Sequence, residues 1–263
     1  MAVDTEKDLQ QLRNRFRELA EKSYHQNIYT FSGFLGLAEQ DIFWQMEKEL
    51  SYAGYCLSGR CPGGKVCTEQ SDRKMIRFGK PEELGYEETF PIVCVHMKPL
   101  AAKFADAFSH RDFLGALMNL GIDRSTIGDI KVGEKEGYLF CLDSIAAFIC
   151  ENLDKVKHTS IRCEIVSDAG EVPEEEPQEV VIQASGERAD GVIAKVYHMS
   201  RTESLDMFRE KKVYINGRLC ENNSRNLKPE DVVNVRGFGK FLYEGVQYET
   251  KKGKLCMKIS LFV

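Results

Sequence analysis

The sequence lacks the features that mark membrane, secreted and repeat proteins. Its longest uninterrupted apolar run, residues 145–150, is far shorter than the roughly 18 residues that a membrane-spanning helix needs. The first eight residues are polar and no apolar segment follows them, so we expect no secretory signal. No repeat with a period of about 20–50 residues is visible. These absences favour a globular protein of the cytoplasm.

The spacing of metal ligands is also missing. Nine cysteines are scattered along the chain. Cys56, Cys61 and Cys67 contain no Cys-x-x-Cys pair, and His25 and His96 are distant from them in sequence. In a cytoplasmic protein, such an odd set is expected to remain as reduced thiols. We therefore expect no metal site and no cofactor.

The sequence contains partial matches to catalytic motifs, but each match lacks a residue that the chemistry requires. Residues 59–65 resemble a phosphate-binding loop, but Val66 stands where that loop needs Ser or Thr to hold Mg²⁺. Residues 110–112 spell the His-Arg-Asp of a kinase catalytic loop, yet the metal-binding Asn of that loop is replaced by Leu117. The stretch after Asp112 also lacks the Thr-Ser-Gly-like segment of a pseudouridine synthase. We expect no catalytic residue and no enzymatic activity.

The segment around His110 keeps two interpretations. His110 and Asp112 could belong to a helix cap, because negative charge is favourable at the positive end of a helix dipole. Alternatively, His110, Arg111 and Arg124 contact an RNA backbone.

Charge is distributed unevenly along the chain. The total of 36 Lys+Arg against 41 Asp+Glu gives a net charge of −5. Residues 185–263 hold 15 basic and 10 acidic residues, a net of +5, which leaves −10 for residues 1–184. A basic module joined to an acidic body is the pattern expected of a protein that binds polyanions.

Residues 1–90 are expected to form helices and a β-hairpin. Leu9, Leu12, Phe16 and Leu19 recur every three or four residues, which indicates one apolar helix face. The expected helices span residues 5–25 and about 38–50, and the expected strands span 52–57 and 75–78.

Residues 91–166 show the clearest order of elements. Strand-like runs and helical spacings follow each other as β-α-β-β-α-β, which is the split-βαβ arrangement of ferredoxin-like and RRM-like domains. This arrangement is a four-stranded antiparallel sheet with two helices on one face. The expected elements span residues 92–97, 110–120, 127–132, 138–142, 143–153 and 160–166.

Aromatic residues of this domain are interpreted mainly as core. Phe104, Phe108 and Phe113 are expected to be buried and not to serve as base-stacking platforms. Tyr138 and Phe140 have an alternative, because the sheet of RNA-recognition modules displays aromatic rings to RNA. The core interpretation is favoured for both.

A linker is expected at residues 167–179. This stretch has two prolines and five glutamates and no core-forming content. It separates an N-terminal body from a C-terminal domain of residues 180–263.

The C-terminal domain resembles the S-four RNA-binding domain, first seen in ribosomal small-subunit protein four. The resemblance lies in the order and spacing of Arg188-Ala189-Asp190-Gly191-Val192-Ile193, Ser200-Arg201, Val213-Tyr214-Ile215-Asn216-Gly217 and Pro229-Glu230-Asp231-Val232-Val233-Asn234-Val235. Ala189, Lys211 and Glu230 depart from the usual pattern but leave its polar positions intact. The resemblance implies that this domain binds structured RNA.

Elementary chemistry agrees with that expectation at two places. Ser200 suits a helix N-cap with Arg201 in the first turn, and a helix N-terminus beside an arginine can hold a phosphate. Asn216-Gly217 suits a tight hairpin turn that leads into Arg218.

A second resemblance covers most of the chain. Residues 109–124 with 127–130, and residues 235–241 with 250–252, resemble signatures of the YlmH family of bacterial RNA-binding proteins. The family resemblance implies a ribosome-associated role in quality control on stalled large subunits that carry peptidyl-tRNA. It also implies that the gene lies near cell-division genes. Residues 58–70 depart from the family pattern.

The sequence thus predicts an α+β protein: N-terminal helices and hairpin, a split-βαβ domain, and an S-four domain. Expected partners are rRNA, tRNA and the large ribosomal subunit, with no membrane and no small-molecule substrate, and we expect a monomer. The alternatives are an RNA-modifying enzyme of the pseudouridine-synthase type and a cell-division scaffold with incidental RNA binding. The predicted RNA-binding residues are Arg188, Ser200, Arg201, Arg209, Lys211, Lys212, Asn216, Arg218, Arg236, Lys240, Lys251, Lys252, His110, Arg111 and Arg124.

Overall fold

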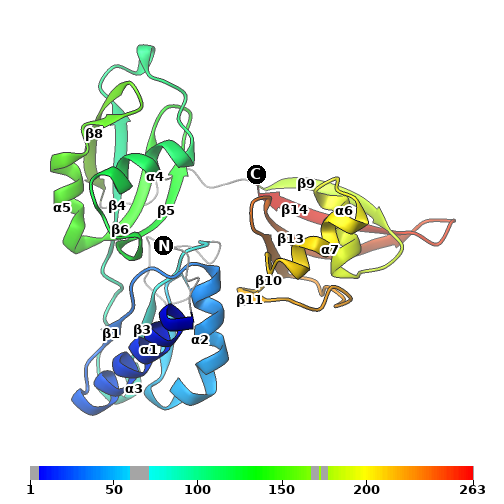
Figure 1. The fold of residues 1–263 in the computed structure, drawn as a ribbon, viewed down its shortest axis with the longest axis horizontal. Helices are drawn as coiled ribbons and strands as arrows, with labels where there is room; N and C mark the ends of the chain where they lie inside the picture. Colours follow the sequence, from blue (N-terminus) through cyan, green and yellow to red (C-terminus); the bar gives the residue numbers. More distant parts are fainter. Residues whose placement is uncertain (1–5, 60–70, 167–171, 173–176, 263) are drawn as a thin grey trace. The chain divides into compact units, whose positions relative to one another are not determined.

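The computed structural model describes residues 6–59, 71–166, 172 and 177–262, and the chain divides into two compact units (Figure 1). The first unit is Met1–Pro173 and the second is Glu174–Val263. The described residues form a mixed α+β structure with three antiparallel sheets and seven α-helices. The predicted α+β class is therefore confirmed.

The first unit begins with two helices on a small sheet of order β1-β3-β2. Phe16 and Leu19 are buried, as their spacing predicts, and the Phe16 ring packs edge-on against Phe43 at 5.7 Å between centroids. The elements are α1 (Glu6–Gln26), β1 (Thr30–Phe31), α2 (Leu37–Leu50), the 3-10 helix η1 (Ser51–Ala53), β2 (Tyr55–Leu57), β3 (Ile76–Phe78) and α3 (Pro81–Leu84).

A five-stranded sheet of order β5-β6-β4-β8-β7 completes the first unit. Helices α4 and α5 pack on one of its faces through Val95, Phe113, Leu139 and Ile149. The elements are β4 (Ile92–Pro99), η2 (Ala102–Phe104), α4 (His110–Asn119), η3 (Arg124–Thr126), β5 (Ile127–Val132), β6 (Gly137–Leu142), α5 (Asp143–Asn152), β7 (Lys155–Val156) and β8 (Thr159–Val166). The predicted order of elements is present, with the two-residue strand β7 added.

The other face of this sheet is covered by residues from the N-terminal part of the unit. Tyr138 and Phe140 are only 4% and 5% exposed and pack with Phe34 and Met75. A Cβ on Gly128 would lie 2.7 Å from the Phe34 ring, so the glycine allows this close approach. Tyr138 and Phe140 are core residues, and the alternative that they face RNA is wrong.

The three phenylalanines that were expected in the core have two different outcomes. Phe108 and Phe113 are buried, which confirms the prediction for them. Phe104 is 82% exposed, so the prediction is wrong there. Phe104 lies in η2, in the connection between β4 and α4.

The second unit has a six-stranded sheet of order β11-β10-β12-β13-β14-β9, with α6 and α7 packed on one face (Figure 1). Val192 and Phe208 from the helices meet Phe241, Tyr243 and Met257 from the sheet. The elements are β9 (Gln178–Ala184), α6 (Ala189–Val196), α7 (Arg201–Arg209), β10 (Val213–Ile215), β11 (Arg218–Leu219), β12 (Asp231–Val235), β13 (Gly239–Glu249) and β14 (Leu255–Phe262).

Strand β9 begins inside the stretch that was predicted as a linker. Gln178 and Glu179 pair with Leu261 and Ser260 of β14. Residues 167–171 and 173–176 of the predicted linker lie outside the described residues.

The described cysteines are thiols with one exception. Cys94, Cys141, Cys150, Cys163, Cys220 and Cys256 are free. Cys56 is disulfide-bonded, so the prediction of a reduced thiol is wrong at this position. Cys61, Cys67 and all but the start of the phosphate-loop-like stretch lie outside the described residues.

Candidate nucleic-acid interface

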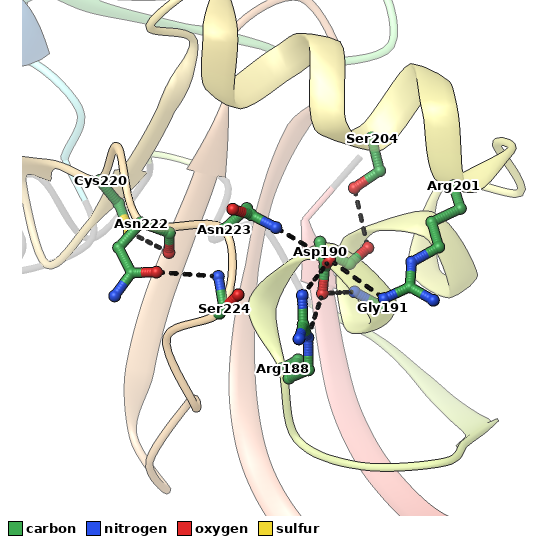
Figure 2. A network of polar contacts seen from close by, with 9 residues as sticks. All are labelled: Arg188, Asp190, Gly191, Arg201, Ser204, Cys220, Asn222, Asn223 and Ser224. Carbon is green, nitrogen blue, oxygen red and sulfur yellow. Dashed lines mark hydrogen bonds and ion pairs between the residues drawn. The ribbon is translucent and has the colours of Figure 1, made fainter.

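A buried carboxylate organises two of the predicted RNA-binding arginines in the second unit (Figure 2). Asp190, in the first turn of α6, is 1% exposed. The Arg188 guanidinium donates two hydrogen bonds to it, from Nε to Oδ1 at 3.1 Å and from Nη2 to Oδ2 at 2.8 Å. Arg201, at the start of α7, places Nη2 3.6 Å from the same Oδ2. One carboxylate thus holds both arginine side chains at the ends of two helices.

Further donors complete this Asp190 network. The Gly191 N–H donates to Oδ1 at 2.8 Å, and the Asn223 amide donates to Oδ2 at 3.2 Å. The Ser204 hydroxyl donates to the Asp190 carbonyl at 2.8 Å, which ties α7 to α6. Burial opposes ionisation of this carboxyl, but the hydrogen bonds from Arg188, Asn223 and the Gly191 N–H, together with the positive charge of Arg188, outweigh it and lower the pKa of Asp190.

Both arginines remain accessible although Asp190 orients them. The Arg188 side chain is 43% exposed and the Arg201 side chain is 70% exposed. A guanidinium has five N–H donors in a planar fork, so donors remain for a phosphate after the contact with Asp190 is made. Sequence reasoning did not select Asp190; the Arg-x-Asp spacing from Arg188 was the available signal.

Ser200 caps α7, as predicted, but it does so together with a carboxylate. Its hydroxyl accepts the Glu203 N–H at 3.2 Å, and the Glu203 carboxylate accepts the Ser200 N–H at 2.7 Å. This capping box lowers the pKa of Glu203. These two N–H groups are already bonded and a carboxylate lies beside them, which disfavours a phosphate at the helix backbone, whereas the Arg201 side chain is exposed.

A second basic group lies at the other end of α7. Arg209, Lys211 and Lys212 form ion pairs with Asp206 at 2.8 Å, Glu221 at 3.2 Å and Glu210 at 2.5 Å. The exposed Arg236 belongs to the same region, because its N–H donates to the Lys212 carbonyl at 2.9 Å. Exposed ion pairs of this kind contribute little free energy, so a phosphate can exchange for the carboxylate.

Asn216 has a structural role in the second unit. Asn216 and Gly217 adopt φ of 54° and 76°, and Ile215 pairs with Arg218 across them, which confirms the predicted tight turn. The Asn216 amide donates to Asp231 at 2.7 Å, and its oxygen accepts the Val232 N–H at 2.9 Å. The turn presents Arg218 at the surface.

The remaining lysines of the second unit differ in exposure. Lys240 is only 8% exposed and its ammonium lies 5.4 Å from the centre of the Phe262 ring, so it is not a surface ligand. Lys251 and Lys252 are exposed in the turn between β13 and β14. Pairing of β12 with β13 ends at Tyr243, so the β13–β14 hairpin extends beyond β12 and carries these lysines at its tip (Figure 1).

The three candidates of the first unit have distinct roles. His110 is the first residue of α4, and Ser109 and Asp112 form the capping box, with the Ser109 N–H donating to Asp112 at 2.8 Å. Desolvation by the surrounding protein and the positive charge of the nearby Arg124 lower the pKa of His110. Arg111 is exposed and lines a groove of about 510 Å³ beside α4, α5 and β7. The helix-cap interpretation is thus borne out for this segment through Ser109 and Asp112.

Arg124 serves the internal structure of the first unit. Its guanidinium donates to the Ile127 carbonyl at 3.1 Å and to the Gly128 carbonyl at 3.2 Å. Burial and the neighbouring Arg73 lower its pKa to about 10. Arg73 in turn donates to the carbonyls of Phe34, Arg124 and Ile127, so the two arginines join the N-terminal part to the five-stranded sheet.

Several observations on the described residues bear on metal binding and catalysis. No group of three or more His, Cys, Asp or Glu side chains there could hold a metal ion. Burial raises the pKa of the Cys94 thiol to about 12, which makes it a poor nucleophile. Asp112 is bonded to Ser109 and to Lys157, the latter at 2.9 Å. None of the helices among the described residues combines the length and the hydrophobicity of a membrane-spanning segment.

Comparison with known proteins finds similarity over part of the chain. Residues 86–169, which include the five-stranded sheet with α4 and α5, match the family model described as "Putative RNA-binding domain in YlmH". Residues 86–169 are therefore similar to a domain that is described as RNA-binding. The match and the curated relative described below agree with the resemblance to YlmH proteins that the sequence predicted.

A curated relative and a solved structure illustrate the similarity. The relative is the ribosome-associated protein quality control protein P2 of Bacillus subtilis (strain 168), 27% identical over 179 residues, which are 66% of each chain. The solved structure is the cell division protein ylmH from Streptococcus pneumoniae, with a TM-score of 0.49 and 13% identity over 65% of this chain and 97% of that one.

Proposed function

We propose that this protein binds structured RNA on the ribosome and acts without catalysis in ribosome-associated protein quality control. The observation that carries the proposal is the similarity to the Bacillus subtilis protein, whose name states that role, together with the RNA-binding family match. The proposed partners are rRNA and tRNA on the large subunit, and the proposed place of action is the cytoplasm.

The second unit is proposed to be an S-four domain and the main RNA contact. Support comes from the Asp190 network, which presents Arg188 and Arg201, and from the tight turn before Arg218. The basic group at the end of α7 and the lysines at the tip of the β13–β14 hairpin add exposed positive charge. These side chains suit phosphates, which position an RNA without reading its sequence.

The first unit is proposed to supply a second RNA contact. Its family match covers the five-stranded sheet, and Arg111 is exposed on α4. Two weak contacts on one chain increase the overall affinity, because the second binding event occurs at a high effective concentration.

Co-sedimentation of the full chain with purified large subunits, with and without bound peptidyl-tRNA, tests the proposal. The double variant Arg188→Ala/Arg201→Ala should bind more weakly and show a salt dependence lower by about two charges. Arg15→Ala is the matched control, because Arg15 is an exposed arginine of α1 with a 3.5 Å ion pair to Glu18. A chain that does not co-sediment, or a double variant that binds like the wild type, contradicts the proposal.

A further inference from the structure

The connection between β4 and α4 displays the most exposed large apolar side chains of the first unit. Phe104 is 82% exposed and Leu100 is 68% exposed. An exposed phenylalanine ring forgoes the free energy that burial would give, and it is free to pack against a partner. The connection can be followed in Figure 1 between the end of β4 and α4.

This connection is fastened to the sheet at both ends. The Leu100 N–H donates to the Ser160 carbonyl at 3.0 Å, and the Lys135 ammonium donates to the Ala102 carbonyl at 2.9 Å. Asp106 accepts the Thr159 hydroxyl at 2.9 Å. The backbone that carries Phe104 is therefore held in place at several points. This reduces the conformational entropy that the connection would lose when a partner binds.

Two lysines contact this connection. The Lys103 ammonium lies 5.8 Å from the centre of the Phe104 ring, and the Lys135 ammonium is bonded to the carbonyl of Ala102, two residues before Phe104. At the base of the connection, Lys98 and Arg162 share one carboxylate, Glu164, at 2.9 and 3.0 Å. Of the other nearby carboxylates, Asp106 is bonded to Thr159 and the His158 N–H, and Glu136 to His96 and Tyr138.

The covered sheet face gives this connection its importance. In RNA-recognition modules the aromatic rings that stack on bases lie on the sheet. Here Tyr138 and Phe140 on that face are buried under Phe34 and Met75. An aromatic contact of the first unit with a base therefore has to be made elsewhere, and Phe104 is the most exposed aromatic side chain among the described residues.

We propose that Phe104 is a stacking platform for one unpaired RNA base, with Lys103 and Lys135 placed for the flanking phosphates. The proposal rests on the proposed RNA-binding function and names the kind of RNA feature that the first unit takes: a loop, bulge or single-stranded end. An aromatic ring beside lysines suits a base between phosphates, because every base offers a π-face and every phosphate a negative charge.

The test compares two RNA probes of equal length, a single-stranded oligouridylate and a blunt-ended duplex, binding to the full-length chain. Phe104→Ala should weaken binding of the single-stranded probe about tenfold and leave duplex binding unchanged. Phe148→Ala is the matched control, because Phe148 is an aromatic side chain of the same unit, 46% exposed on α5, with Asp143 and Glu151 on the same helix. Phe148→Ala should leave both affinities unchanged.

A spectroscopic variant separates stacking from folding. Phe104→Trp should bind the single-stranded probe like the wild type, and that probe, but not the duplex, should quench the added indole fluorescence. Equal affinity of Phe104→Ala and the wild type for single-stranded RNA overturns the stacking proposal while the RNA-binding function stands. Loss of ribosome co-sedimentation by Phe104→Ala with unchanged RNA binding would assign the connection to a protein partner and also overturns it. A wild-type chain that binds neither probe nor ribosomes overturns both proposals.

Discussion

We predict that removing the two partners of the Asp190 network lowers stability by different amounts. Arg188→Ala removes two hydrogen bonds and leaves a carboxylate that is 1% exposed, with Arg201 3.6 Å away. Removing one partner of a buried charge pair costs roughly 3–5 kcal/mol, and the retained contacts of Arg201, Asn223 and Gly191 should reduce this to about 2–3 kcal/mol.

Asp190→Asn should cost less than Arg188→Ala. It removes the buried charge and keeps the shape of the side chain, and the exposed arginines that it leaves are hydrated by water. We expect a loss of about 1–2 kcal/mol. In the variant Arg188→Ala/Asp190→Asn the two losses of stability should not add. Once residue 190 is neutral, removing the Arg188 side chain no longer leaves a buried charge without its partner. The coupling free energy should be about 1–2 kcal/mol.

Acid should reveal the same group. The pKa of Asp190 is lowered in the folded protein, so its ionised form stabilises the fold at neutral pH, and this contribution is lost as the pH falls through the folded-state pKa. The difference in stability between the wild type and Asp190→Asn should therefore shrink in acid.

Hydrogen exchange of α6 and α7, measured in the full chain with urea, reports the second unit alone. The role given to the buried carboxylate would be refuted if Arg188→Ala lowered the stability of the second unit less than Asp190→Asn does. It would also be refuted if the two losses of stability simply added.

The structure makes four further predictions. Phe140→Ala should lower the free energy of unfolding by about 3–5 kcal/mol in urea denaturation, because its ring is buried; a loss under 1 kcal/mol would contradict the covered sheet face. Gly217→Ala should cost about 1–2 kcal/mol at φ 76°, seen as a lower thermal midpoint. Lys251→Ala should reduce the salt dependence of RNA binding by about one charge, whereas Lys240→Ala, at a buried position, should not; equal effects would sink the distinction. His110→Ala should change RNA or ribosome association at most, and the finding of a modified or hydrolysed nucleotide that this variant fails to make would overturn the non-catalytic proposal.

Local sequence patterns predicted the local structure well. The spacing of Phe16 and Leu19 gave the buried face of α1, and Asn216-Gly217 gave the turn between β10 and β11. Ser200 was correctly predicted as the cap of α7. Each of these features is decided within a few residues of the chain, so the sequence contains the whole reason for it.

Long-range contacts explain what the sequence did not reveal. Alternation shows that Tyr138 has an apolar environment on one sheet face, but not that Phe34, about a hundred residues earlier, covers it. A lysine is normally expected at the surface, but the Lys240 side chain lies against Phe262 on the neighbouring strand. Phe104 reads as core, because its exposure depends on where the connection leaves the sheet.

The pairing of charges was hidden for the same reason. Arg124 was predicted to contact RNA, but the carbonyls of Ile127 and Gly128 accept its hydrogen bonds. Asp190 was passed over, since only the folded unit brings Arg201 and Asn223 to the carboxylate that Arg188 already reaches.

Crosslinking the full chain to stalled large subunits, followed by mapping of the crosslinked nucleotides, tests the central claim most directly. The account predicts crosslinks from the Arg188–Arg201 surface and from the tip of the β13–β14 hairpin to rRNA and to the bound tRNA, and their loss in Arg188→Ala/Arg201→Ala. Absence of rRNA and tRNA crosslinks from the wild-type chain, or crosslinks that the double variant retains in full, would contradict it.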